Sequence, residues 1–219
     1  QPAVNNAREY SLGGWRMERL NQPTVSIQEK MCLFWTNHFG ATASFDARGV
    51  YNMHQLYRAN CLGNFKQLVK DITIDPNMLF FLNGVSNNQF APNENYAREV
   101  LELFTVGKGL QVGPGDYSNY TEADVAAGAK IFTGWTVDGM LSDTLTSPQA
   151  VYYPILHDAT VKTLSAYFGN ATVNNADNLE YSNYIDIIFQ QPNMAKFICR
   201  KLYRWFVNYD LTPAVESTV

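Results

Sequence analysis

The chain has 219 residues, of which 46% are hydrophobic and 16% are charged, a composition typical of a globular protein and unlike that of a disordered one. This length fits one domain with a sizeable core. The net charge of −4 argues against nonspecific nucleic-acid binding, which needs a dense surface of Lys and Arg. No run approaches the roughly 18 consecutive apolar residues of a membrane span, so we predict none.

The cysteines indicate neither a disulfide framework nor a zinc site. Cys32, Cys61 and Cys199 are an odd number, and no two of them have CxxC spacing. All three fall within helical patterns at positions that suit a small apolar side chain. We therefore predict that they are structural core residues.

A first helix is predicted from Ser26 onward. Ser26 and Glu29 have the spacing of a capping box, in which each side chain bonds to the other residue's backbone N–H. Four later positions share one side of a helix at 100° per residue. They are Ile27, Met31, Phe34 and His38. The pattern predicts a helix with a buried stripe that includes His38.

Three more helices are predicted in the first half of the chain. One begins at Ala47 with Asp46 as its N-cap, and the next runs from Asn64 to Ile72. The third starts at Pro76, because proline is favourable at a first helical position.

A central helix, NENYAREVLELFTVG, is predicted from Asn93 to about Val106. One compact face is apolar and must pack on the core. Arg98 lies four residues from both Glu94 and Glu102, so we predict an ion-pair ladder with Glu99 outside it. Two interpretations of this charged face stay open: a solvated surface, or a face that meets other parts of the fold.

The second half of the chain changes character twice. Thr121 and Asp124 have capping-box spacing and open a predicted helix, TEADVAAGAKIFTGW. We predict a short extended or hairpin excursion around residues 136–165, where helical periodicity is absent. Two helices close the chain, the last from Pro192, in an otherwise compact, mainly α, multi-helix domain spanning residues 1–219. The predicted apolar face of this last helix consists of Ala195, Ile198, Cys199, Leu202, Trp205 and Phe206.

Five segments carry a resemblance to a known family. They are EKMCLFWTNHF (Glu29 to Phe39), YRANCLGNFKQLV (Tyr57 to Val69), NENYAREVLELFTVG, YTEADVAAGAKIFTGW (Tyr120 to Trp135) and HDATVKTL (His157 to Leu164). In their order and spacing they resemble an uncharacterised bacterial family catalogued as domain of unknown function 1800. The similarity spans about Trp15 to Phe206. It implies an exported protein, periplasmic or at the cell surface, of which this chain is a core segment; no activity is established for the family.

The best candidate metal ligands are His38, Glu99, His157 and Asp158. No pair of them has the spacing of a metal motif such as HExxH. The family's usual block FWHNHF reads FWTNHF here, with Thr36 at the first histidine position. We therefore predict no bound metal and no cofactor, and name these four residues as the ligands if a metal is bound.

The candidate catalytic residues are Glu99, Glu102, His157 and Asp158. Glu99 and Glu102 are three positions apart on a helix, which places their Cβ atoms about 5–6 Å apart and couples their titrations. Glycosidases hold two carboxylates on opposing sides of the scissile bond. A hydrolase would therefore pair one of these glutamates with a distant partner, His157 or Asp158.

A structural role for the same glutamates stays open. Either one is also predicted to join a buried polar network with an arginine of the last helix, Arg200 or Arg204. The candidate binding residues are His38, Asn95, Arg98 and Trp135.

Two functions follow as expectations. The first is a noncatalytic exported or cell-surface domain that binds or assembles with an envelope protein or a polysaccharide. An aromatic content of 14% suits such a surface. The second is a hydrolase of an envelope or extracellular carbohydrate. Convergence of Glu99, His38, His157 and Asp158 in one cleft would favour the hydrolase.

Overall fold

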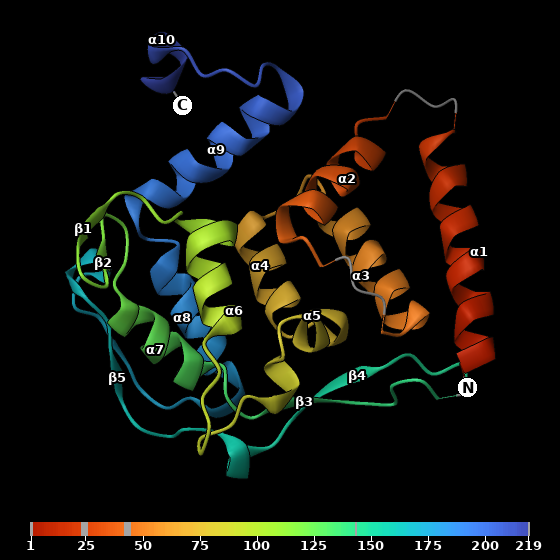
Figure 1. Ribbon diagram of the computed structural model, residues 1–219, viewed down its shortest axis with the longest axis horizontal. Coiled ribbons are helices and arrows are strands. Elements are labelled where there is room, and N and C mark those ends of the chain that lie inside the picture. The colour runs from red at the N-terminus through yellow and green to blue at the C-terminus, as the bar shows by residue number, and fades with distance from the viewer. Residues whose placement is uncertain (1, 23–25, 42–44, 143, 219) are drawn as a thin grey trace.

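The fold is mainly α, as predicted, with short hairpins at its edge (Figure 1). The computed structural model describes residues 2–22, 26–41, 45–142 and 144–218. The α-helices are α1 (Pro2–Leu20), α2 (Gln28–Phe39), α3 (Ala47–Asn60), α4 (Phe65–Thr73), α5 (Pro76–Phe81), α6 (Asn95–Glu99), α7 (Glu122–Ile131), α8 (Glu180–Ile188), α9 (Pro192–Phe206) and α10 (Pro213–Glu216). The 3-10 turns are η1 (Gly84–Ser86), η3 (Pro154–Leu156), η4 (Ala166–Phe168) and η5 (Asp177–Leu179), and η2 (Val100–Thr105) is a π-helix.

The strands form three separate antiparallel pairs. They are β1 (Gln111–Gly113) with β2 (Asp116–Tyr117), β3 (Trp135–Asp138) with β4 (Gln149–Tyr152), and β5 (Lys162–Thr163) with β6 (Thr172–Val173). The β3–β4 pair confirms the predicted hairpin, with Trp135 opposite Tyr152. Among the described residues, no helix combines the length and the apolar character needed to cross a membrane.

Most predicted helix starts are confirmed by side-chain caps. Asp46, Asn64 and Asp75 accept backbone N–H groups at the starts of α3, α4 and α5, and Thr121 forms a complete capping box with Asp124 at α7. The capping box predicted at Ser26 is wrong. Helix α2 starts at Gln28 without a side-chain cap, and the Ser26 hydroxyl accepts only the Gln28 N–H, at 3.2 Å.

One large apolar core extends from α2 to α8, with α4 and α6 near its centre (Figure 1). Ala97 of α6 packs tightly on α7, because a Cβ added at Gly128 would lie 3.0 Å from the Ala97 side chain. Leu68 of α4, Val100 of η2 and Ile185 of α8 are fully buried in this core. The apolar face of the predicted central helix is therefore confirmed as a core element.

The second half of the central helix is wound more widely than an α-helix. After Glu99 it continues as a π-helix, η2, whose bonds join residues five apart. The Val106 N–H donates to the Leu101 carbonyl, five residues before it, and the Thr105 hydroxyl donates to the Val100 carbonyl. The wider winding changes which side chains are stacked along the helix.

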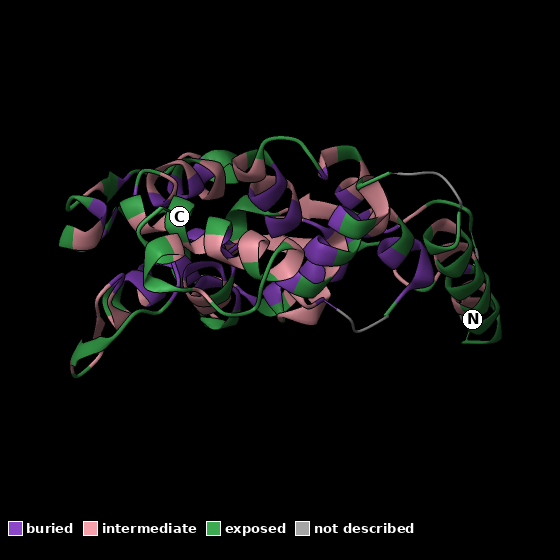
Figure 2. Cartoon of the chain, turned by 90° about the horizontal axis from the view of Figure 1, so that it is seen from above, coloured by how far each residue is buried: buried purple, intermediate pink, exposed green. Residues whose placement is uncertain are grey.

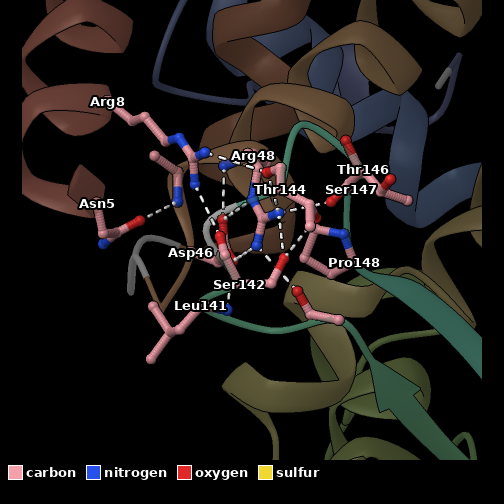
Figure 3. A network of polar contacts seen from close by, with 12 residues as sticks. Asn5, Arg8, Asp46, Arg48, Leu141, Ser142, Thr144, Thr146, Ser147 and Pro148 are labelled. Atoms are coloured by element: carbon pink, nitrogen blue, oxygen red, sulfur yellow. Dashed lines mark hydrogen bonds and ion pairs between the residues drawn. The ribbon is translucent and has the colours of Figure 1, made fainter. Parts of the chain in front are cut away.

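Helix α1 forms a separate layer at one end of the molecule (Figures 1 and 2). Leu12, its only buried residue, meets Ala47 and Val50 of α3 in a small apolar cluster of its own, against which Trp15 also packs. The tip beyond β3, residues 139–142 and 144–148, contacts this layer. Figure 3 shows Arg8 of α1 donating to the Ser142 carbonyl (3.2 Å) of that tip, and Arg48 of α3 donating to Ser142 Oγ (2.9 Å) and to the Thr144 carbonyl (3.0 Å).

The last long helix is less buried than its pattern predicts. Ile198 is buried in α9, whereas Ala195 and Cys199 are exposed. Cys32 and Cys61 lie in the core, so the prediction of a core thiol is wrong only for Cys199. The physical reason is that α9 covers the edge of the core with one narrow side, and its broader surface faces solvent.

Candidate functional site

The charged face of the central helix meets α7 through Arg98. Both guanidinium Nη atoms bond to the Glu122 carboxylate at 2.7 Å, and Nη2 also reaches Glu94 at 3.0 Å. The hydrogen bonds with Glu122 raise the pKa of Arg98, and Arg98 in turn lowers the pKa of Glu122. The predicted ladder is thus half formed, and its strongest contact is with another helix.

Glu102, the other end of the predicted ladder, turns away from Arg98 because it lies in the π-helical part. Its carboxylate accepts from the Tyr120 hydroxyl at 2.8 Å and from Lys108 Nζ at 3.2 Å. The predicted network with the last helix is not formed among the described residues, since Arg200 pairs with Glu216 at 3.1 Å and Arg204 is exposed.

Glu99 is half-buried, and its carboxylate has no hydrogen-bond partner within the described ranges. Burial and the charge of Glu102 raise the pKa of the Glu99 carboxyl, and the charge of Arg98 opposes this rise. Asn95 is exposed, and its backbone N–H bonds to the Asn93 side chain at 2.9 Å. This surface therefore offers one carboxylic acid with a raised pKa beside several charges already paired.

His157 belongs to a buried charge network. Its Nδ1 bonds to the Thr133 carbonyl at 3.0 Å, and its Nε2 lies 3.0 Å from Glu180 Oε2. The other oxygen of Glu180 accepts from Lys162 Nζ at 2.6 Å. Glu180 is 0% exposed, and His157 and Lys162 are each 3% exposed. The network joins β5 to the start of α8, and its polar groups satisfy one another away from solvent.

Asp158, next to His157, organises the turn that follows it. Although burial acts to raise its pKa, hydrogen bonds from the Thr160 side chain and backbone lower it. Its carbonyl accepts from Lys162 Nζ, and its N–H donates to Thr133 Oγ1 at 2.8 Å. Every one of these contacts holds the chain between α7 and β5.

His38 is buried in an aromatic group, as its helical stripe predicts. Its Nε2 lies 3.0 Å from the Phe104 carbonyl, and since a carbonyl only accepts, Nε2 carries the proton. Lys201 Nζ can then donate to Nδ1, which is 3.3 Å away. Burial, and secondly the charge of Lys201, lower the pKa of His38 to about 3, and burial lowers that of Lys201 to about 8. The imidazole is neutral at neutral pH and links α2, η2 and α9.

Trp135 begins β3 and is half-buried. Its ring packs against Tyr152 and Tyr181, with centroids 5.3 Å and 5.7 Å away. Because Tyr152 lies on β4 and Tyr181 on α8, the Trp135 ring packs the β3–β4 hairpin against α8. Its role as a binding residue stays a prediction.

The structure distributes these residues over separate places. Arg98 meets the first turn of α7 at Glu122, whereas His157 meets Thr133, just beyond the last turn. Ten residues of α7 separate these ends by about 15 Å. His38 bonds to the Phe104 carbonyl of η2 and to Lys201 of α9. Within the described ranges, no three His, Cys, Asp or Glu side chains are grouped so that they could hold a metal ion.

Two adjoining cavities instead lie on the side of α1 that faces α3. The larger, about 650 Å³, is formed by α1, α3 and the tip beyond β3. Its walls include Arg8, Ser11, Trp15, Tyr51 and Asn52. The smaller, about 380 Å³, lies between α1, α2 and α3. Trp15 lines both cavities, so they adjoin one another.

A comparison with models of known protein families identifies the family of this chain. The model of a family described as "Protein of unknown function (DUF1800)" matches residues 2–219. This chain belongs to the DUF1800 family. No curated protein and no solved structure matches this DUF1800 chain.

Several residues of this DUF1800 domain carry no motif in the sequence that marks them as functional. Lys162 stands within the segment HDATVKTL, so a lysine beside an HD pair was a usable signal, but its partner Glu180 is distant in sequence. Trp15, Tyr51 and Arg16 line the cavities and stand in no motif. Only the packing of α1 on α3 brings them together.

Proposed function

We propose that this domain binds a polysaccharide in the surface depression between α1 and α3, as part of an exported or cell-surface protein. The observation that carries the proposal is the Trp15–Tyr51 pair. The two rings pack edge to face, with centroids 5.2 Å apart, at the larger cavity. Tyr51 is 40% exposed, so its ring is accessible to a ligand.

The composition of the cavity wall suits a sugar chain. Sugar rings have an apolar C–H face and a rim of hydroxyl groups, and aromatic side chains with a few polar groups complement both. Ser11, Asn52 and Ser147 supply hydroxyl and amide groups beside the rings. The volumes of the two adjoining cavities, about 650 and 380 Å³, fall in the range of ligand sites.

Affinity electrophoresis against a panel of neutral and acidic polysaccharides tests this proposal. Tyr51→Ala should weaken binding about tenfold, because truncating an aromatic anchor removes most of its contact area. Trp15→Ala should do the same, with circular dichroism verifying that α1 persists. Phe90→Ala is the matched control, since Phe90 is 79% exposed and lines neither cavity. Absence of binding to every polymer, or equal binding by Tyr51→Ala and Phe90→Ala, would contradict the proposal.

An extracytoplasmic location belongs to the same proposal, because envelope polysaccharide lies outside the cytoplasm. Fractionation of cells expressing the tagged full-length protein measures it directly. We expect the tag in the periplasm or at the cell surface, and recovery in the cytoplasm would contradict this part of the proposal.

A second candidate, hydrolysis of an envelope or extracellular carbohydrate, is favoured by Glu99. Burial and the charge of Glu102 raise the pKa of Glu99, as is typical of the general acid in glycosidases. Release of reducing ends from a bound polymer measures this activity. Glu99→Gln should abolish the release and Glu94→Gln should leave it intact. A wild-type protein that binds a polymer without cleaving it contradicts the hydrolase.

A further inference from the structure

The smaller cavity differs from the larger one in its charge. Arg16, Arg19 and Arg58 line it, together with His54 and a single acidic residue, Glu29. Glu29 forms an ion pair with Arg58, which leaves the charges of Arg16 and Arg19 in excess. Neither of these two guanidinium groups has an ion pair or a side-chain hydrogen bond with any residue that the structure describes.

Both excess arginines are partly withdrawn from water. Burial lowers the pKa of Arg16, and its interaction with Tyr57 only partly opposes this. The Nε atom of Arg19 is buried without a hydrogen-bond partner. Burial, and secondly the charge of Arg16, lower the pKa of His54 to about 4, so His54 is neutral at neutral pH and adds no third excess charge. A buried N–H donor without a partner is costly, and an anionic oxygen from a ligand would satisfy it.

We infer that the cavity between α1, α2 and α3 binds the carboxylate or sulfate group of an acidic polysaccharide, through Arg16 and Arg19. The guanidinium fork matches either anion by paired N–H donors. Trp15 forms the shared wall with the larger cavity, so a charged group bound here would belong to a sugar adjoining the one at Tyr51. This inference rests on the proposed polysaccharide binding and specifies its substrate class.

Two matched pairs of polymers test the inference and separate the two anions. Polygalacturonate and its methyl ester differ only in the carboxylate charge, and dextran sulfate and dextran differ only in sulfate. We expect the wild-type domain to bind at least one acidic member about tenfold or more tightly than its neutral counterpart. Arg16→Gln with Arg19→Gln should remove this preference, while binding of the neutral polymer persists.

The control for charge alone is Arg204→Gln, an exposed arginine on α9 that lines neither cavity. It should keep the preference. The double variant Arg16→Lys with Arg19→Lys retains the positive charge and should keep part of the preference for the acidic polymer. This variant also provides a test if the Gln variant folds poorly.

The outcomes distinguish this inference from the function on which it rests. Equal wild-type affinity for the acidic and neutral members overturns the anion site and leaves polysaccharide binding standing. An equal loss of preference in the Arg204→Gln variant also overturns it, because attraction would then reflect net charge alone. Absence of binding to every polymer of the wider panel, these four included, overturns the proposed function itself.

Discussion

Two groups of buried or partly buried basic side chains in this molecule differ in whether a carboxylate pairs with them. Lys162 lies in the core, where Glu180 and His157 complete its contacts. Arg16 and Arg19 lie on α1, where the one carboxylate that lines their cavity, Glu29, is paired with Arg58. Burying a cation is favourable only with a partner, so the first group is structural, and the second points to a ligand. The first group lies in the large apolar core, and the second lies in the α1 layer, which packs on that core through few buried side chains.

The largest expected effect comes from breaking the core network. Glu180→Ala leaves Lys162 and His157 buried without their carboxylate, and removal of one partner of a buried ion pair costs about 3–5 kcal/mol. Urea unfolding monitored by circular dichroism measures the free energy of unfolding. Glu94→Ala, at an exposed ion pair, should cost less than about 1 kcal/mol. Similar losses in both variants would remove the contrast between core and surface charges.

Asp75 offers the converse case, a buried carboxylate without an ion pair to any described cation. It accepts N–H groups of Asn77 and Met78, but burial raises its pKa to about 7. The folded state therefore holds its proton more tightly than the unfolded state, and stability should fall as the pH rises from about 4 through about 7. Asp75→Asn keeps the helix cap and should reduce this loss by about 2–4 kcal/mol.

Urea midpoints of the wild type and Asp75→Asn at pH 4.5, 6 and 8 measure this difference. The other titrating groups are common to both proteins, so they cancel in the comparison. Parallel pH profiles would show that the Asp75 carboxyl is not destabilised by its burial.

Loosening the α1 layer should have a local effect. Leu12→Ala removes the single buried side chain of α1, at a local cost of about 2 kcal/mol. Hydrogen exchange should accelerate in α1 alone, while the midpoint of global unfolding changes little, because the large core does not contain Leu12. Uniform acceleration over α2 to α8 would contradict the separation of layer and core.

The smallest effect is expected at the charged face of the central helix. Arg98→Ala removes the bonds to Glu122 and Glu94, but the Arg98 side chain is 34% exposed, so the loss should be about 0.5–1 kcal/mol. Thermal unfolding measures it, with Lys108→Ala as a neighbouring control. A loss of unfolding free energy above about 2 kcal/mol would show that these ion pairs stabilise the fold as the buried network does.

The features that the sequence predicted correctly are local ones. A cap needs only a side chain two or three positions from the N–H group it accepts, so Asp46 and Thr121 were identifiable from spacing alone. The burial of His38 follows from one helical stripe, and a hairpin after Trp135 follows from a loss of helical periodicity. The sequence placed Trp135 itself in the preceding helix, whereas α7 ends at Ile131 and Trp135 begins β3.

The features that were not predicted depend on distant parts of the chain. Helix α1 contains Gly13 and Gly14 and buries one residue, so its sequence carries no strong stripe. The candidate site residues were treated as one group because they are polar, but their partners, such as Glu180 for His157, are set by the fold. The π winding after Glu99 also has no simple sequence signal, and it redirected Glu102 to Tyr120.

The separate small cluster beneath α1 has an evolutionary consequence. Substitutions on α1 and on the facing side of α3 change the walls of both cavities without disturbing the large core, because α1 contributes nothing to that core. The walls of the proposed site can therefore vary among relatives at little cost in folding. The lining of that site and the stability of the large core are nearly independent traits of this fold.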